Sequence, residues 1–588
     1  MADSLLLRRI PALAALQGYD RETFRHDLVA GLSVAAVAVP QAMAYALIAG
    51  LPPEYGLYTA IVMTAAGALL DSSRQLINGP TNALSIALLS VVGAIASPDE
   101  KVQVAVMMAF LIGAVQLGIS LLRLGDLTRY ISHSVIVGFT AGASLLLLLD
   151  QTKNLLGQKS VGDPHDHFLL RFWRSLTEGG PVHVPTVAIG IGAIVAVLTL
   201  RWAKARLKMP LFPELLVVVA LAAAVTAALG LDQQGVKVIG AIPARLPSPA
   251  LPHFDLHRME DMLSGAFALG VLGLLEAVSM AKSIAAVTRQ KLDLNQQCLS
   301  EGVANLTGSF FQCMPGSGSL TRSAINQQAG ARTQWSGVIS AVAVGAVMMV
   351  FAPYAQYVPR SALAGILMLT AGRMVNFEDL RYHLRASRFD AVIVAATAIG
   401  AFAISIEFCV LIGVFLSFAL TVPRAGNILL SEFVVGDDGG IHERIPSDKA
   451  CTRILIFGLE GELFFGAATS LEAHFDAIDG RIGPETRVVV LRLKRAHNPD
   501  AVGMSMLIGL YERLEARGVR VLLCGVRREM AGLLRRTELG GKVPADQIFL
   551  EEPVRRTSTI RAVRHAYDLL GDDLCRSEEH TSELQSPC

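Results

Sequence analysis

Two short segments interrupt long apolar stretches with proline, glycine and small hydroxyl residues. Residues 79–85 read GPTNALS, and residues 315–323 read PGSGSLTRS. A helix that begins halfway through a bilayer points unpaired N–H groups and a partial positive charge into the space before it. Two such helix starts that face each other form a site for an anion. The alternative is that the small residues only let helices pack closely.

Side chains in both segments can add hydrogen-bond donors to such a site. Hydroxyl donors lie at Thr81, Ser317, Ser319 and Thr321. A glycine such as Gly318 lets the backbone approach a ligand. Arg322 supplies the only strongly basic group expected at this depth, so we predict that it contributes to anion binding.

Glu276 lies inside the apolar run VLGLLEAVSM. A carboxylate at the centre of a bilayer is costly, so such a residue is protonated, paired or functional. We interpret Glu276 as a proton carrier, and the alternative is a structural ion pair with Arg322 or Lys282. Gln41 and Tyr45 lie one helical turn apart and can face the same cavity. Tyr45 alone is equally well explained as a core or interface aromatic residue.

The composition indicates that a membrane domain holds these residues. Of 588 residues, 52% are apolar and 17% are charged, whereas soluble domains carry about 25% charged residues. That deficit excludes a disordered chain, a nucleic-acid-binding protein and a solely soluble enzyme. Lys and Arg number 51 against 50 Asp and Glu, and a net charge of +1 attracts no polyanion at long range. Anion binding must therefore be local.

Apolar stretches follow one another from residue 27 to about residue 424. Several are shorter than the roughly 20 residues that a full crossing needs, so these must be half-helices. We predict fourteen spans, near residues 28–48, 57–70, 80–96, 104–122, 131–150, 185–200, 212–230, 262–284, 297–313, 318–330, 336–354, 361–375, 389–404 and 406–423.

An even number of spans places both ends of the chain on one side of the membrane. The loops that would then share that side carry most of the basic residues, which are Arg123, Arg129, Arg201, Lys204, Arg206, Lys208, Arg289, Lys291, Arg373, Arg381, Arg385 and Arg388. The positive-inside rule therefore predicts cytoplasmic termini in the inner (plasma) membrane. Lys153, Lys159, Arg171 and Arg174 count mildly against this orientation, and residues 1–26 form a cytoplasmic segment without an evident signal peptide.

The two interrupted segments also suggest an internal repeat. Pro80 and Pro315 lie 235 residues apart, and the same offset carries Pro40 and Gln41 onto positions 275 and 276. Polar sites in transporters often occupy corresponding positions of two repeats. Because each repeat would contain seven spans, an odd number, the two repeats should be inverted relative to each other.

A soluble α/β domain is predicted after the membrane region. We divide the chain into a transport domain at 27–425, a linker at 426–450, an α/β domain at 451–572 and a tail at 573–588 that resembles a non-native appendage. Apolar runs at 454–457, 488–491 and 519–523 predict strands, and 468–479, 501–517, 527–538 and 556–570 have helical patterns. The seven cysteines form no CxxC pair, so we expect them to be reduced.

Other chemistry lacks its motifs. The chain contains neither a G-x-x-x-x-G-K-[ST] sequence nor HExxH, which argues against a nucleotide site and a zinc site. We therefore expect no enzyme activity, no cofactor and no metal. His165 and His167 flank Asp166 in a polar break, and we interpret them as solvated residues.

Several longer motifs resemble the sulfate permease (SulP) family of anion transporters. They are DLVAGL at 27–32, VPQAMAYA at 39–46, GLPPEYGLY at 50–58, GPT at 79–81, EAVSMAK at 276–282, NQ at 295–296, GVAN at 302–305 and SLTRSAIN at 319–326. The soluble end resembles a STAS domain. The likeness covers nearly the whole chain except its last residues.

The resemblance implies an α-helical polytopic protein with fourteen spans in two inverted seven-span repeats. These would form core and gate subdomains, usually in a homodimer. The anion would lie between the starts of spans three and ten. By position, the site falls on Gln41, Tyr45, Thr81, Asn82, Ala83, Ser319, Thr321 and Arg322, with Glu276 in span eight.

Two positions bear on coupling and regulation. The sodium-coupled branch of the family has an aspartate in span eight followed four residues later by threonine, whereas Met280 follows Glu276 here. The proton-coupled members have a glutamate. In STAS relatives that act as phosphorylation switches, a hydroxyl residue stands where this chain has Val502, so we predict that this route of regulation is absent.

These observations predict a proton-coupled symporter of small inorganic or carboxylate anions, working by an elevator-type movement. Within transport, the alternatives are an uncoupled exchanger or channel, and a transporter of bicarbonate or C4-dicarboxylates. A membrane sensor or scaffold that signals to a cytoplasmic partner through the STAS domain is the alternative from another class.

Overall fold

The structure is a computed structural model of the 588-residue chain. It describes residues 10–571 except 94, 96, 126–131, 163–165, 208, 210–211, 405, 437–439, 449–450, 537–541 and 553–556. The predicted tail and the predicted basic residues Arg129 and Lys208 therefore lie outside the described residues, as does His165. The chain forms two compact units, residues 1–417 and 418–588, which are described separately below.

The first unit is a multi-helix membrane domain. Each of the fourteen predicted spans overlaps a helix, and these helices are α3 (Arg21–Ile48), α4 (Pro53–Leu70), α5 (Asn82–Val92), α6 (Pro98–Leu121), α7 (His133–Leu156), α9 (Val184–Arg206), α10 (Glu214–Ala228), α11 (Leu256–Thr288), α12 (Leu294–Ser309), α13 (Leu320–Gln328), α14 (Trp335–Ala355), α15 (Arg360–Met374), α17 (Arg388–Ala403) and α18 (Ile406–Ala425). Within the described residues, 7 helices are long and apolar enough to cross a membrane on their own. The short helices α5 and α13 are the interrupted segments.

Three further helices occupy segments that the hydropathy pattern left between spans. They are α2 (Pro11–Ala15), α8 (Phe168–Glu178) and α16 (Phe377–Ala386). Both α8 and α16 alternate apolar and polar residues with helical spacing, which is typical of helices that lie along an interface.

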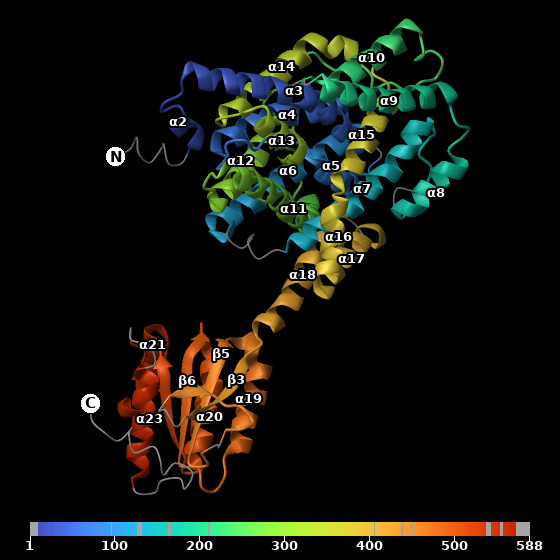
Figure 1. Ribbon diagram of the computed structural model, residues 1–588. Helices are drawn as coiled ribbons and strands as arrows, with labels where there is room; N and C mark the ends of the chain where they lie inside the picture. Colours follow the sequence, from blue (N-terminus) through green and yellow to red (C-terminus); the bar gives the residue numbers. More distant parts are fainter. Residues whose placement is uncertain are drawn as a thin grey trace. The chain divides into compact units, whose positions relative to one another are not determined.

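The helices pack mainly within two groups. One contains α3, α4, α6, α11, α12, α13 and α14, and Figure 1 shows α3 and α14 side by side within it. The other contains α7, α9, α15 and α17. Glycines permit close crossings in both groups: a Cβ at Gly113 of α6 would lie 2.6 Å from the backbone nitrogen of Leu306, and one at Gly138 of α7 would lie 2.6 Å from the carbonyl oxygen of Val394.

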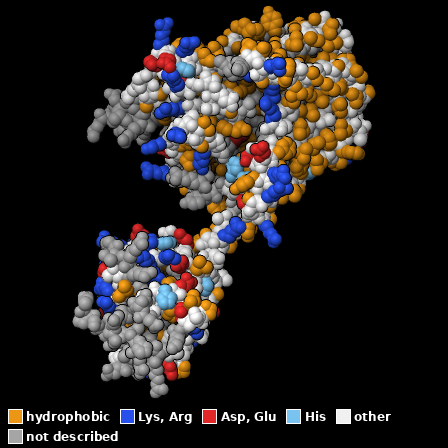
Figure 2. Space-filling model, in the orientation of Figure 1, with side chains coloured by type: hydrophobic (Ala, Val, Ile, Leu, Met, Phe, Trp, Pro, Cys, Tyr) orange, Lys and Arg blue, Asp and Glu red, His pale blue; other side chains and the backbone are white. Residues whose placement is uncertain are grey.

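The outer surface of this unit is apolar. Figure 2 shows hydrophobic side chains spread across it, and exposed examples come from α9 (Val184, Trp202), α14 (Val342) and α17 (Ile399). An exposed apolar surface of this extent marks contact with lipid rather than with water.

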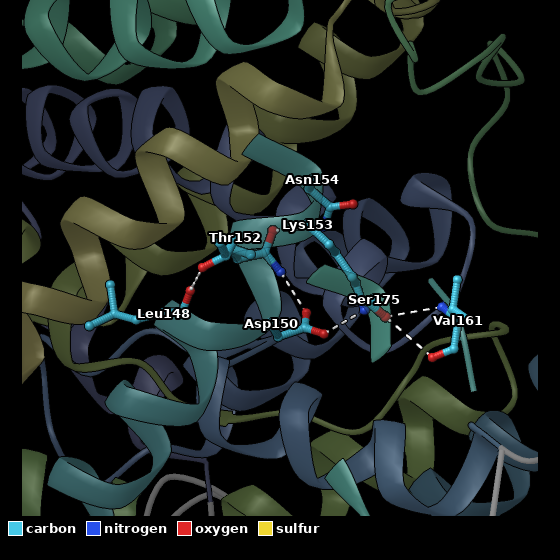
Figure 3. A network of polar contacts seen from close by, with 8 residues as sticks. Leu148, Asp150, Thr152, Lys153, Asn154, Val161 and Ser175 are labelled. Carbon is cyan, nitrogen blue, oxygen red and sulfur yellow. Dashed lines mark hydrogen bonds and ion pairs between the residues drawn. The ribbon is translucent and has the colours of Figure 1, made fainter. Parts of the chain in front are cut away.

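Local hydrogen bonds hold the end of α7, as Figure 3 shows. Lys153 lies in the last helical turn, where a positive charge is favourable, and its Nζ is 2.8 Å from Oδ1 of Asp150. The Ser175 hydroxyl on α8 accepts a 3.0 Å bond from the backbone nitrogen of Val161. The first contact is internal to α7, and the second joins α8 to the segment before it.

The interrupted segments meet each other. Asn78–Gly79 (β1) pairs antiparallel with Ser317–Gly318 (β2), with Asn78 opposite Gly318 and Gly79 opposite Ser317. Pro80 and Pro315, which are 235 residues apart in the sequence, therefore do not occupy equivalent positions relative to the two paired strands. Thr81 and Ser319 hold the equivalent N-cap positions of α5 and α13, 319 − 81 = 238 residues apart.

The caps of α5 and α13 therefore differ by three residues from the offset between the prolines, whereas the caps of α3 and α11, Asp20 and Asp255, keep it, at 255 − 20 = 235. Pro80 follows β1, whereas Pro315 precedes β2. Both prolines break helical structure, but they do so on opposite sides of the short strand. The equivalence of Gln41 with Glu276 therefore stays a prediction.

The second unit is a mixed α/β domain. Its six-stranded sheet has the order β4-β3-β5-β6-β7-β8, from β3 (Leu429–Val435), β4 (Ile441–Glu443), β5 (Ile454–Glu462), β6 (Val488–His497), β7 (Arg520–Val526) and β8 (Ile548–Leu550). The pairs β5–β6, β6–β7 and β7–β8 are parallel, and β3 pairs antiparallel with both β4 and β5. Helices α19 (Ala468–Arg481), α20 (Ala501–Ala516), α21 (Arg528–Arg536) and α23 (Thr557–Leu570) complete it.

Both faces of this sheet are covered, as expected for parallel strands. Leu455, Val489 and Val521 face the cluster that contains residues of α19, α20 and α21. Ile456 and Val490 face α23. The strands that we predicted are present, but residues 426–450, which we predicted to be a linker, carry β3 and β4. The sequence pattern did not reveal these two strands because neither contains a long uninterrupted apolar run.

Candidate anion-binding site

The starts of α5 and α13 lie side by side because β1 pairs with β2. Thr81 caps α5 by accepting a hydrogen bond from the backbone nitrogen of Leu84, and Ser319 caps α13 by accepting one from Arg322, both at 3.5 Å. Each cap satisfies one free N–H group and leaves the others of the first turn without a helical partner. The pairing thus gathers two positive helix ends in one place.

Glu276 of α11 joins both helix starts. Its Oε2 is 3.1 Å from the Thr81 hydroxyl and 3.2 Å from the Ser317 hydroxyl. The Ser317 hydroxyl is also 3.0 Å from the carbonyl oxygen of Gly273. A serine hydroxyl has a single hydrogen, so it can donate to only one of these acceptors. When it donates to the carbonyl oxygen of Gly273, the Ser317 hydroxyl oxygen can accept a hydrogen bond from a protonated Glu276 carboxyl group.

Arg322 lies beneath the same site with 1% of its surface exposed. Its Nη2 donates to the carbonyl oxygen of Pro80 at 2.9 Å, while its Nε has no partner among the residues described. The guanidinium packs against the backbone of Gly79, where a Cβ would lie 2.7 Å from Nη1.

The ion-pair interpretation of Glu276 is wrong with respect to Arg322. Within the described part of the chain, no ion pair joins the two, although their charges are close enough to interact. Lys282 lies further along α11 with an exposed side chain. Glu276 is instead held by hydroxyl groups, which can accommodate either protonation state.

Gln41 and Tyr45 of α3 are both buried, at 2% and 4% exposure. The amide oxygen and nitrogen of Gln41 lack hydrogen-bond partners in the described structure. Gln41 lines a cavity of about 790 Å³ together with Thr321 of α13. A buried amide without a hydrogen-bond partner beside a cavity is a candidate ligand for a polar molecule or ion that enters the cavity.

The remaining predicted residues have packing positions. Asn82 and Ala83 are buried in the first turn of α5. At Gly318 a Cβ would lie 2.9 Å from Cα of Ala277, so the missing side chain lets β2 approach α11. For Gly318, the close-packing alternative describes what its small size does.

Sequence reasoning missed the charged groups at the other end of this cavity. Arg201, Lys204 and Glu214 line it, as does Arg373. Glu214 pairs with both Arg201 (3.3 Å) and Lys204 (2.9 Å). We used the basic residues only as topology signals, and nothing in the spacing indicated that α9, α10 and α15 bring them together.

Known proteins share the sequence pattern and the fold of this chain. A sequence profile of the sulfate permease family matches residues 24–397, and one of the STAS domain matches residues 446–553. The chain belongs to the sulfate permease family. It is a multi-pass membrane transporter and not an enzyme.

Individual relatives extend the comparison. The putative sulfate transporter YvdB of Bacillus subtilis is 28% identical over 91% of this chain and 97% of its own length. The murine Slc26a9 anion transporter, solved in the inward-facing state, has a TM-score of 0.86 at 20% identity over 96% of this chain and 95% of that one. The transmembrane domain of the cyanobacterial bicarbonate transporter BicA has a TM-score of 0.59 at 24% identity over 67% of this chain and 97% of that one. These two structural likenesses establish the fold of the transporter.

The predicted regulatory position lies in the STAS domain at the start of α20. Asp500 caps that helix through a 2.9 Å bond from the backbone nitrogen of Gly503 and also accepts a 2.8 Å bond from Phe465. Val502 is 42% exposed in the first turn. The position is accessible, but valine has no hydroxyl group to accept a phosphate.

Proposed function

We propose that this transporter carries sulfate or a similar small oxyanion together with protons. The observation that supports the proposal most directly is the position of Glu276, whose carboxyl group contacts hydroxyl groups at the starts of both α5 and α13. The charge of a group at this position interacts directly with the charge of any anion bound between the two helix starts.

The electrostatics explain why a proton is needed. Two helix ends and Arg322 favour an anion, whereas an ionised Glu276 in the same dry site repels it. Protonation removes that repulsion, and the protonated carboxyl can then donate to the Ser317 oxygen while Ser317 donates to Gly273. Binding of the proton and binding of the anion therefore favour each other, as linkage requires.

The donor set suits an oxyanion. Gln41 of α3 and Leu320 and Thr321 in the first turn of α13 line the cavity, so an amide, a hydroxyl and the start of a helix can donate to an anion from different directions. Sulfate offers four acceptor oxygens, and the relative YvdB is named a putative sulfate transporter. Met280 stands where the sodium-coupled branch has threonine, which favours protons over sodium.

Movement and orientation form part of the proposal. The two groups of helices that pack mainly within themselves support an elevator-type movement of one group past the other, carrying the site with it. Both termini would be cytoplasmic, and the cavity that Gln41 and Arg373 line would open to that side. The transporter would act as a homodimer, with the STAS domain free to bind a cytoplasmic partner.

Radiolabelled sulfate uptake into proteoliposomes tests the function. An inward proton gradient should drive accumulation by the wild-type protein, and Glu276→Gln should abolish the response to the gradient. Gln keeps the shape of the protonated acid, so anion exchange without a gradient should continue. Accumulation that ignores both the gradient and the substitution would instead indicate the uncoupled exchanger.

A chain truncated after Gly426 separates transport from signalling. Uptake by this truncated chain would assign the STAS domain a regulatory role. Absence of uptake even in the complete chain, with every anion tested, would favour the sensor or scaffold.

A further inference from the structure

One face of α12 carries four buried polar residues. Gln297, Ser300, Glu301 and Asn305 each have 0% of their surface exposed. They follow the spacing that places side chains along one side of a helix, over about 12 Å from the first to the last. Such a polar stripe inside a membrane domain marks either packing between helices or a path for a polar species.

One end of the stripe surrounds Asp71, which ends α4. Oδ1 of Asp71 accepts hydrogen bonds from Gln297 and Ser300, each at 2.7 Å, and its carboxylate also accepts one from Asn78 of β1 at 3.2 Å. Three donors offset part of the cost of burying this carboxyl group.

The same end lies beside a surface cavity. Gln334 donates to the backbone oxygen of Asp71 at 3.1 Å. Gln334 and Ser72, the residue after Asp71, both line a cavity of about 860 Å³. Water in this cavity therefore reaches Ser72, the residue next to Asp71 in the chain.

The other end of the stripe contacts the anion site. Asn305 binds both sides of Gly316: it accepts from the backbone nitrogen at 3.1 Å and donates to the carbonyl oxygen at 3.0 Å. It also donates to Gln116 of α6 at 3.0 Å. Gly316 precedes Ser317, whose hydroxyl contacts Glu276. The stripe thus runs from the surface cavity to the proposed proton carrier.

Glu301 lies between these two ends and differs from its neighbours. Both of its carboxyl oxygens are buried and have no hydrogen bond of normal geometry within the described residues, because the neighbouring Gln297 amide is directed to Asp71. The acidic groups near enough to act on it are Asp71 from the end of α4 and Glu276 from α11, while α6 faces the stripe with the neutral Gln116. An ionised carboxylate here would be both desolvated and repelled, so Glu301 is stable as the neutral acid.

We propose that Glu301 is a second proton-binding group of this transporter and passes protons between Glu276 and the Asp71 end of the stripe. In the transfer, the O–H bond of the Glu301 acid breaks as an O–H bond forms on ionised Glu276. A proton from the surface cavity then restores the Glu301 acid. The proposal rests on the proton coupling proposed above. It also separates the two cargoes, because the anion reaches the site through the other cavity, beside Gln41.

Glu301→Gln tests this role because glutamine keeps the shape of the neutral acid but carries no transferable proton. Two activities are measured in proteoliposomes: sulfate accumulation driven by a proton gradient, and sulfate exchange at equal pH. Exchange moves the loaded transporter in both directions and needs no proton release. We expect accumulation to slow by about tenfold or more, the scale of a lost proton-transfer group, with exchange near the wild-type rate.

A matched control is Glu54→Gln, which removes a half-buried carboxyl group from α4 at a distance from the stripe and should leave both activities unchanged. Wild-type accumulation by Glu301→Gln would overturn the proposal and make Glu301 a neutral packing residue. If Glu301→Gln does not fold, Glu301→Met decides, because methionine is similar in size and also carries no transferable proton: slowed accumulation with normal exchange supports the relay, and wild-type values for both overturn it. Failure of the underlying function has another signature, which is wild-type accumulation that does not respond to the gradient.

Discussion

Replacing Gly79 by alanine adds one methyl group, which should damage the anion site by displacing Arg322. A Cβ there would lie 2.7 Å from Nη1 and 3.1 Å from Nη2 of Arg322, closer than such atoms approach. Gly79 also has φ +141, a region in which a residue with a side chain costs about 1–3 kcal/mol. Gly79→Ala therefore strains β1 and pushes the guanidinium away from the site.

The size of the effect follows from the bonds at risk. A displaced guanidinium loses its 2.9 Å bond to Pro80, and a hydrogen bond from a charged group contributes about 1.5–3 kcal/mol. If half of that loss, about 0.8–1.5 kcal/mol, reaches the bound anion, affinity falls by about four- to twelvefold, since about 1.4 kcal/mol corresponds to a factor of ten. Stability should fall by about 1–3 kcal/mol from the backbone strain.

The assay is sulfate binding and uptake by purified protein, together with thermal unfolding. Gly118→Ala in α6 is the control, because a Cβ there meets nothing within 4 Å and alanine favours a helix by about 0.5–1 kcal/mol over glycine. A folded Gly79→Ala protein that binds sulfate as tightly as the wild type would refute the assigned role of Arg322.

Three further perturbations give distinct results. Thr81→Val removes both the cap of α5 and a donor to Glu276, so thermal unfolding should show a loss of about 1 kcal/mol and proton-driven uptake should fall; Thr81→Ser, which keeps the hydroxyl, should restore both, and an active valine variant would contradict the site. Gln41→Leu breaks no hydrogen bond in the described structure, so stability should hold while sulfate affinity drops about tenfold; unchanged affinity would exclude Gln41 as a ligand. In the STAS domain, burial raises the pKa of Cys524 to about 12. The unfolded thiol titrates near 8.5, so stability should decline as pH rises above that value, and thiol labelling at pH 8 should modify half-buried Cys451 before Cys524; equal labelling would contradict this.

The positions of the helices were largely predictable because apolar segments must cover the thickness of a bilayer. Each predicted span overlaps a helix, and the segments around Thr81 and Ser319 could be recognised as helix starts from their proline, glycine and hydroxyl residues. The strands of the STAS domain were predictable where they are buried on both faces, as at 488–491. β3 and β4 were not, because Ser431 and Glu432 interrupt the apolar residues of β3 and β4 has only three residues.

The sequence could not reveal how polar groups pair inside the membrane unit. Nothing in the sequence marks Asp71, Gln297 and Ser300 as a cluster, because only the packing of the end of α4 against α12 brings them together. The unpaired state of Glu301 depends on every neighbouring helix, so no local pattern signals it. The same holds for the register in which β1 pairs with β2.

The most direct test of the account measures proton movement itself. Proteoliposomes with a pH-sensitive dye inside are given an inward sulfate gradient at equal starting pH. The account predicts that the interior acidifies with the wild-type protein and does not acidify with Glu276→Gln, while both proteins still exchange sulfate. Sulfate uptake by the wild-type protein without acidification would contradict the claim that one site binds the anion and the proton together.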